Sequence, residues 1–252
     1  MPTAPRSPFP TAVFLGDCVT TGWRSLSHPR NRWTSLVCEH LRWREVNLAA
    51  DGMGFFVRRG GHLPGGGRSP SCRDSTWLET AVRAEPDVLT VCLGLNDAAV
   101  LPSHLDLVRR AVGHDLEFLA HRLRGVPVVV APYFPGLDVG PRFAVVRRLI
   151  HERATELGLS SSDAATRAVA GAAARLAADG IHPDDAGHAA IARAMIGVYR
   201  RVAPSLCGRG PAPAPGRRDR VGPIQPRVRG GLSCRSPTSQ RSPTSPGPQA
   251  CP

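Results

Sequence analysis

A cysteine, a histidine and an aspartate stand where they could together form a nucleophilic site. Cys18 lies in the motif Gly-Asp-Cys-Val-Thr-Thr-Gly, after an apolar run and before a helical stretch. His182 lies in Asp-Gly-Ile-His-Pro, three residues after Asp179. An imidazole activates a thiol by accepting its proton, and a carboxylate bound to the other ring nitrogen holds the tautomer that this requires. The pattern therefore predicts Cys18 as nucleophile, His182 as its base and Asp179 as the residue that orients His182.

Each of these residues also has a purely structural interpretation. A free cysteine is more often a small buried apolar residue than a nucleophile, and this is the interpretation we favour for Cys38 and Cys92. His182 could simply line a turn, because Pro183 and the two aspartates after it are typical of a helix start. His188 lies six residues further on, inside the predicted helix, and we assign it no role.

Asn96 could bind the negative oxygen that develops when a nucleophile attacks a carbonyl group. It follows the apolar run 88–93 in the motif Gly-Leu-Asn-Asp. A side-chain amide at the end of a strand can direct an N–H into a site at that position. The alternative is an ordinary turn residue, because asparagine is common after strands.

The elements that would position these residues follow an α/β pattern. Short β-rich runs alternate with helical patterns, which predicts a parallel sheet with helices on both faces. The predicted strands are 11–15, 45–48, 88–93 and 126–131. A fifth strand near 158–163 is less distinct, because three successive serines are not typical of a strand. Apolar residues at helical spacing predict helices over 105–123, 143–157 and 191–198.

We expect one domain over residues 11–207, flanked by disordered segments at 1–10 and 208–252. The C-terminal segment is rich in Pro, Gly, Ser and Arg and has too few apolar residues to offset the entropy cost of ordering. It holds eight arginines and one aspartate, so +7 of the formal net charge of +12 lies there. This concentration argues against a nucleic-acid-binding face, although an arginine-rich arm for RNA or a protein partner is an alternative.

The composition favours a cytoplasmic protein without metal or cofactor. No apolar run approaches the roughly 20 residues of a membrane span, and the first ten residues hold no apolar core of a secretory signal. The seven cysteines are odd in number and form no Cys-x-x-Cys pair, which argues against a disulfide framework and suits a reducing compartment. No cluster of His, Cys, Asp or Glu has the spacing of metal ligands.

The motifs around Cys18, Asn96 and His182 resemble the sequence blocks of the SGNH hydrolases, also called the GDSL esterase/lipase superfamily. The first block of that family reads Gly-Asp-Ser-x-(Ser/Thr)-x-Gly, with serine as the nucleophile, and Cys18 stands here in the place of the serine. The resemblance covers about residues 11–203. It implies a flavodoxin-like three-layer α/β/α sandwich with a parallel central sheet, and an enzyme that hydrolyses or transfers acyl groups.

The same resemblance implies which groups form the oxyanion hole. The segment Asn-Leu-Ala-Ala-Asp-Gly-Met-Gly is similar to the second block of the family, in which a glycine backbone N–H is a donor. It points to Gly52, with Gly54 as a substitute or a plain turn glycine as the alternative. Gly52 would act beside the backbone N–H of Cys18 and the side chain of Asn96. We expect loops 60–71 and 133–141 near this site.

Sulfur in place of oxygen would change the chemistry of such an enzyme. A nearby helix N-terminus and an imidazolium lower a thiol pKa, so we expect Cys18 to be substantially thiolate at neutral pH. Its intermediate would be a thioester, which reacts with amines more readily than an oxygen ester does. This favours a thioesterase or acyltransferase acting on a small-molecule acyl group, free or carrier-bound as in secondary metabolism. The alternatives are an ordinary esterase with a cysteine nucleophile and a non-catalytic binding protein on the same scaffold.

Overall fold

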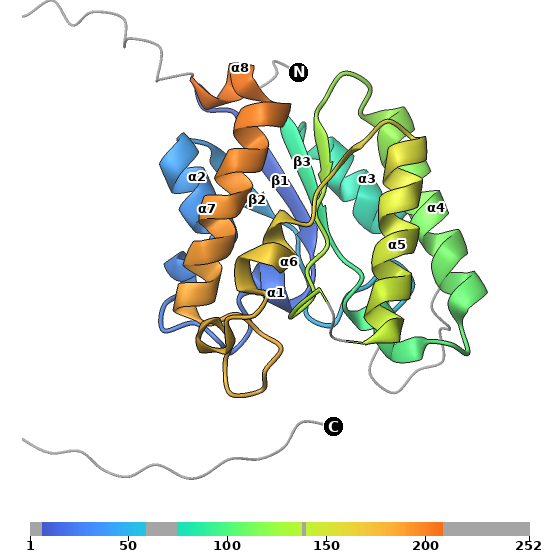
Figure 1. Cartoon of the computed structure of the whole chain (residues 1–252). Coiled ribbons are helices and arrows are strands. Elements are labelled where there is room, and N and C mark those ends of the chain that lie inside the picture. The colour runs from blue at the N-terminus through green and yellow to red at the C-terminus, as the bar shows by residue number, and fades with distance from the viewer. Residues whose placement is uncertain (1–6, 59–74, 138–139, 209–252) are drawn as a thin grey trace, which may run out of the picture. The chain divides into compact units, whose positions relative to one another are not determined.

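A parallel sheet forms the centre of the part of the chain that the computed structural model describes, which is residues 7–58, 75–137 and 140–208 (Figure 1). Its strands are β1 (Thr11–Gly16), β2 (Arg44–Asn47), β3 (Val88–Cys92), β4 (Val128–Val130) and β5 (Ser160–Ser161). They pair in the order β2-β1-β3-β4-β5, and all neighbouring pairs are parallel.

The burial of the strands follows from their place in the sheet. Every residue of β1, β3 and β4 is buried, as expected for apolar strands covered by helices on both faces. The edge strand β2 is only partly buried. The less distinct fifth strand exists as the two-residue β5, whose serines pair with Val129 and Val130. Serines are tolerated there because an edge strand does not need to fill the core.

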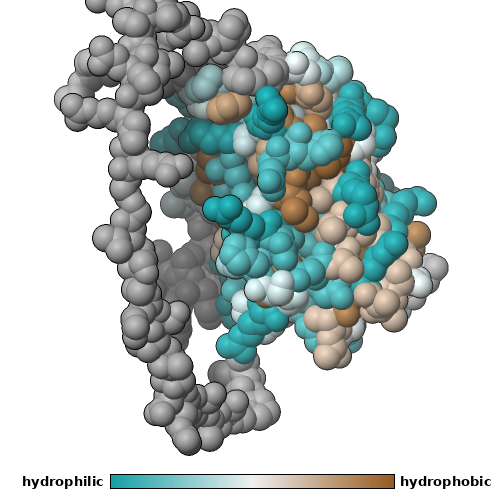
Figure 2. All heavy atoms as spheres, turned by 90° about the vertical axis from the view of Figure 1, so that its left-hand side faces the viewer, coloured by the Kyte–Doolittle hydropathy of each residue, from teal (hydrophilic) through white to brown (hydrophobic). Residues whose placement is uncertain are grey.

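Two layers of helices cover the sheet. The α-helices are α1 (Cys18–Thr21), α2 (Trp33–Leu41), α3 (Thr76–Arg83), α4 (Leu105–Arg122), α5 (Pro141–Glu156), α6 (Ala164–Val169), α7 (Asp185–Val202) and α8 (Pro204–Cys207). Single 3₁₀ turns are η1 (Pro29–Asn31), η2 (Asn96–Val100) and η3 (Ala173–Arg175). Helices α2, α6 and α7 pack together on one face, and α3, α4 and α5 cover the other (Figure 1). The outer surface on the side of α2 and α7 is mainly hydrophilic, with apolar patches among the polar side chains (Figure 2).

The strand order confirms the flavodoxin-like fold class. The chain moves outward from β1 to β2, returns past β1 to β3, and then continues outward in the opposite direction. The loops after β1 and β3 therefore diverge at the carboxyl edge of the sheet, which is where open α/β sheets bind ligands. Cys18 lies two residues after the end of β1, and Asn96 lies four residues after the end of β3.

The helix α7 illustrates how local sequence and packing act together. The Asp184 carboxylate accepts the Gly187 backbone N–H at 2.8 Å, so the predicted helix start after Pro183 is confirmed as an N-cap. Inside the helix, the fully buried His188 accepts the Trp33 backbone N–H at Nδ1. Burial lowers the pKa of His188 to about 4, so this ring stays neutral and ties α7 to α2.

Several sequence-based expectations fall outside the described residues. These are the disordered segments except residues 7–10 and 208, and the whole of loop 60–71. The Pro10 carbonyl accepts the Arg44 backbone N–H at 2.7 Å, so the packed chain begins just before β1. Across the described ranges, no helix combines the length and the apolar character needed to cross a membrane.

The C-terminal boundary can be tested by truncation. The Trp43 indole N–H donates to the Leu206 carbonyl at 3.1 Å, and the Leu206 side chain is buried. A chain that ends at Gly208 should melt at the same temperature as the full chain. A chain that ends at Ser205 should lose about 2 kcal/mol or more of stability, because a buried leucine and a hydrogen bond are removed. Calorimetry of both chains measures this difference, and equal melting temperatures would show that α8 contributes nothing.

Candidate active site

The fold brings together the cysteine and the histidine, which are separated by 164 positions in the sequence. The Cys18 Sγ lies 3.1 Å from His182 Nε2, and His182 Nδ1 lies 2.5 Å from an Asp179 carboxylate oxygen. When Nδ1 carries the ring proton and donates to Asp179, Nε2 is free to accept the proton of the thiol. The arrangement is that of a nucleophile, a base and an orienting carboxylate.

The segment that carries Asp179 and His182 is held by its own hydrogen bonds. The second Asp179 oxygen accepts the backbone N–H groups of Ile181 and His182 at 2.8 and 2.9 Å. The Tyr133 hydroxyl donates to the Ile181 carbonyl at 2.6 Å, which anchors the segment to the loop after β4. Burial alone would raise the pKa of Asp179, but the hydrogen bonds from His182 and Ile181 lower it below its usual value. The carboxylate is therefore ionised at neutral pH and can hold the imidazole.

The expectation of a thiolate at Cys18 is wrong for the resting site. The Cys18 side chain is buried, and burial, with a smaller effect of the Asp17 charge, raises the pKa of its thiol to about 12. The helix α1 has only four residues, so its dipole is small and does not offset burial. The thiol is therefore protonated at neutral pH.

Two backbone N–H groups favour the charged form of the Cys18 thiol. They belong to Gly52 and to Cys18 itself, and both lower the pKa of the thiol, although less than burial raises it. Gly52 sits in a turn with φ of 72°, a conformation that glycine adopts without strain. The alternative donor, Gly54, gives its N–H to the Val57 carbonyl at 2.9 Å. The geometry therefore favours Gly52 over Gly54 as a donor to a developing oxyanion.

Asn96 lies beside this pair, but its amide group is already engaged. Its Nδ2 donates to the Met53 carbonyl at 2.9 Å and, over a longer 3.4 Å, to the Asp17 carboxyl. The longer bond is the one that an oxyanion could replace at least cost. The three predicted oxyanion positions therefore meet around the residue pair Asp17–Cys18.

Asp97 has a structural role that the sequence analysis did not assign. Its fully buried side chain accepts the backbone N–H groups of Phe55, Phe56 and Val57 at 2.8, 2.9 and 3.2 Å. A Cβ at Gly54 would lie 2.5 Å from this carboxylate, so glycine is needed for the loop to approach. These hydrogen bonds hold the loop after Gly52 against η2, the turn that follows β3. The only signal in the sequence was an acidic residue directly after Asn96.

The sequence analysis also did not identify two side chains at the rim of the site, Trp23 and Ile181. The Trp23 ring lies against the His182 ring with centroids 5.2 Å apart, and the Arg24 guanidinium lies 4.9 Å above Trp23. Ile181, next to His182, is 40% exposed and is one of the few large apolar side chains on the described surface. Trp23 and Ile181 thus place apolar side chains beside the imidazole.

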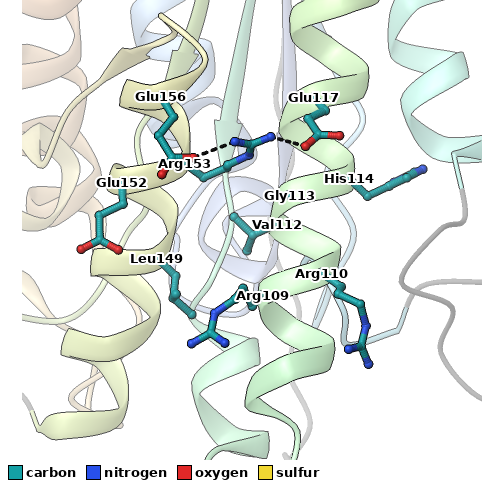
Figure 3. Close-up of a pocket in the computed structure, with 10 residues that line it drawn as sticks. All are labelled: Arg109, Arg110, Val112, Gly113, His114, Glu117, Leu149, Glu152, Arg153 and Glu156. Carbon is teal, nitrogen blue, oxygen red and sulfur yellow. Dashed lines mark hydrogen bonds and ion pairs between the residues drawn. The ribbon is translucent and has the colours of Figure 1, made fainter.

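A separate groove of about 760 Å³ lies between α4 and α5 (Figure 3). Its walls are largely charged, and Arg153 joins Glu117 on α4 to Glu156 on α5 across it. None of the residues around Cys18 lines this groove. It is therefore distinct from the candidate site at the carboxyl edge of the sheet.

A known protein family matches the part of the chain that contains these candidate residues. The model of the GDSL-like Lipase/Acylhydrolase family matches residues 14–190, a range that contains every candidate position from Cys18 to His182. The chain belongs to this family. The family assignment that the motifs predicted is thus confirmed, and the protein is a GDSL/SGNH-type hydrolase, a class that acts on ester bonds.

Several known proteins are similar to this chain in sequence or in fold. A GDSL lipase of Mycobacterium tuberculosis is 29% identical over 184 residues, which are 71% of this chain and 76% of that protein. The crystal structure of TesA has a TM-score of 0.59 at 18% identity and covers 76% of this chain and 99% of its own. The psychrotrophic esterase EstA of Pseudoalteromonas sp. has a TM-score of 0.55 at 15% identity, with 76% and 97% covered. At such identities the two structures show likeness of fold alone.

The carboxyl of Asp17 makes the site sensitive to pH. Its side chain is 1% exposed and accepts the Val19 backbone N–H at 3.0 Å. Burial, reinforced by the charge of Asp97, raises the pKa of Asp17 from 3.8 to about 7. The folded protein thus binds the proton more tightly than the unfolded chain. The stability that this proton contributes is full below the unfolded pKa and is lost as pH rises through about 7.

The comparison of wild type with Asp17→Asn tests this assignment, because asparagine stays neutral at every pH. Between about pH 4 and 7, the wild type should lose stability relative to Asp17→Asn, by at most about 1.4 kcal/mol per unit of pKa shift. Urea unfolding at several pH values gives the difference. Asp106→Asn, which changes an exposed acid, is the control. Parallel curves for wild type and Asp17→Asn would show that Asp17 has an ordinary pKa.

Proposed function

We propose that the protein is an acyl-transfer enzyme that works through a thioester on Cys18. Cys18 is the nucleophile, His182 the general base and Asp179 the residue that orients the imidazole. The backbone N–H groups of Cys18 and Gly52 and the side chain of Asn96 form the oxyanion hole. The observation that carries the proposal is the 3.1 Å approach of the Cys18 sulfur to His182 Nε2, with Asp179 on the opposite ring nitrogen.

The reaction begins with a neutral thiol. As the sulfur attacks the carbonyl carbon of an ester or thioester, the thiol proton moves to His182 Nε2 and the carbonyl oxygen becomes negative. The N–H donors stabilise this oxygen, a contribution of roughly 3–4 kcal/mol for one donor in comparable enzymes. When the tetrahedral intermediate collapses, the leaving group takes the proton from His182 and the acyl group remains on Cys18 as a thioester.

The second half of the reaction determines the product. Water or an amine attacks the thioester, His182 accepts the proton of the attacking group, and Cys18 leaves as a thiol that regains this proton. A thioester favours amines over water more strongly than an oxygen ester does. The sulfur therefore favours a thioesterase or acyltransferase with an amine or thiol acceptor.

A specific observation favours a second candidate function, plain ester hydrolysis. The buried thiol is protonated at rest, with its pKa raised to about 12, so it depends on His182 in the way a serine hydroxyl does. An enzyme of this kind would use cysteine as a direct substitute for serine. The names of the M. tuberculosis lipase and the EstA esterase agree with ester hydrolysis in relatives of this chain.

The nucleophile can be identified by acylation. With p-nitrophenyl butyrate as acyl donor, mass spectrometry should find a butyryl adduct on Cys18 in the wild type and none in Cys18→Ala. Turnover should fall by at least about a thousandfold in Cys18→Ala and in His182→Ala, because the members of a triad act as a unit. Cys207→Ala is the matched control, since Cys207 is a more exposed free thiol away from the site. An adduct that persists in Cys18→Ala would disprove the assignment.

The type of reaction can be read from product partition. With an acyl thioester and millimolar amine, the wild type should form more amide per free acid than Cys18→Ser does, because an oxygen-ester intermediate is less readily aminolysed. Chromatography of the two products gives the ratio, which does not depend on the total rate. The same ratio for both proteins would favour the hydrolase over the transferase.

A further inference from the structure

The turn that presents the Gly52 N–H is bound from its outer side by Arg58. The Arg58 Nη1 donates to the Asp51 carbonyl oxygen at 3.2 Å. This carbonyl and the Gly52 N–H belong to the same peptide group. The N–H of that peptide lowers the pKa of the Cys18 thiol, and its carbonyl oxygen binds a guanidinium cation.

The orientation of this peptide is not determined by the chain alone. The Met53 N–H donates to the Ala50 carbonyl at 3.1 Å, which closes a turn with Asp51 and Gly52 in its centre. The φ of 72° at Gly52 corresponds to the third position of a type II turn. A type I turn differs by a flip of the central peptide, which would turn the Gly52 N–H away from Cys18. A hydrogen bond to the Asp51 carbonyl favours one of the two orientations.

The contacts around the turn fit such a role. A Cβ at Gly52 would lie 3.0 Å from the Arg58 Nε and 3.1 Å from its Cζ, so glycine lets the guanidinium lie close to the turn. Arg58 itself has φ of 58°, a left-handed conformation that is costly for a residue with a side chain. On the other side, the Thr21 hydroxyl binds the Asp51 carboxylate at 2.5 Å. The Asp51–Gly52 peptide is thus held by α1 and by Arg58 together.

We propose that Arg58 is a positioning residue for the oxyanion hole, which it serves by fixing and polarising the Asp51–Gly52 peptide. A cationic donor on the carbonyl draws electron density through the peptide and makes the N–H on its other side a stronger donor. This strengthens the bond to a negative oxygen more than the bond to a neutral carbonyl. The inference rests on the proposed function, because it assumes that the Gly52 N–H meets an oxyanion formed by attack of Cys18.

The test compares two reactions of the same thiol in full-length wild type and Arg58→Gly. The kcat/KM for nitrophenolate release from p-nitrophenyl butyrate reports acylation, which creates an oxyanion. The rate of Cys18 alkylation by iodoacetamide reports attack by the same Cys18–His182 pair without an oxyanion. Arg58→Gly should lower the ratio of acylation to alkylation about tenfold, which is less than the roughly hundredfold or greater cost of losing a donor altogether.

Arg42→Gly is the matched control. Arg42 also has a left-handed backbone, with φ of 56°, but it caps α2 just before β2, at the edge of the sheet opposite Cys18. Its replacement should leave the ratio unchanged. Melting curves should show that neither glycine variant is less stable than the wild type, because glycine relieves the strain of a positive φ.

The outcomes separate this inference from the proposed function. A fall in the ratio for Arg58→Gly alone supports the role of Arg58. Partial unfolding would expose the buried Cys18 thiol and speed its alkylation, so a fall in the ratio counts only when the melting curve of Arg58→Gly matches that of the wild type. An unchanged ratio overturns the inference while the proposed function stands. An equal fall in Arg42→Gly also overturns it. If the wild type forms no acyl adduct at Cys18, the proposed function is wrong and this inference is wrong with it.

Discussion

The parallel pairing of β1 with β3 is the constraint on which the site depends. The register aligns Gly16 with Cys92, so the two strands end side by side at the carboxyl edge of the sheet. The loops that leave them turn in opposite directions because the strand order reverses at this point. Cys18 and Asn96 meet there, and no local interaction between their own segments is needed to bring them together. A change in this register would separate the proposed nucleophile from the proposed oxyanion donor.

Burial at this edge determines the electrostatics of the site. Asp17 and Cys18 are both withdrawn from water, and the pKa of each is raised, to about 7 and about 12. Asp179 is more exposed, accepts three hydrogen bonds, and has a lowered pKa. At neutral pH the Asp179 carboxylate is therefore fully ionised, Asp17 is only partly ionised, and the sulfur is neutral. In the proposed reaction, charge reaches the sulfur and the carbonyl oxygen only as His182 takes up the proton.

The loop from residue 50 to residue 58 shows how much support one backbone donor requires. On the buried side, the Asp97 carboxylate accepts three backbone N–H groups of this loop. Arg58 binds it from the solvent side at the Asp51 carbonyl. Both side chains bind backbone groups of this loop. They hold in place a peptide that could otherwise flip, and a flip of this kind would remove a donor without changing any other residue.

The sequence by itself determined the strands, the start of α7 and the family, because these depend on local composition and short motifs. The apolar runs predicted four strands, and each predicted strand end lies within two residues of the observed one. Asp179 and His182 were paired because they are three positions apart. The roles of Asp97, Trp23 and Arg58 could not be predicted in this way. Each depends on contacts with a segment whose approach only the folded sheet determines.

The protonation of Cys18 is the clearest example of what only the tertiary structure decided. The motif predicts a thiol at a helix start, and a helix start by itself lowers a thiol pKa. The fold makes that helix one turn long and buries the sulfur beside Asp17, so desolvation outweighs the dipole. Residue types and their order fix which groups are available for chemistry. The protonation state of those groups depends on the amount of water and the charges around them, and these are set by packing between segments far apart in the chain.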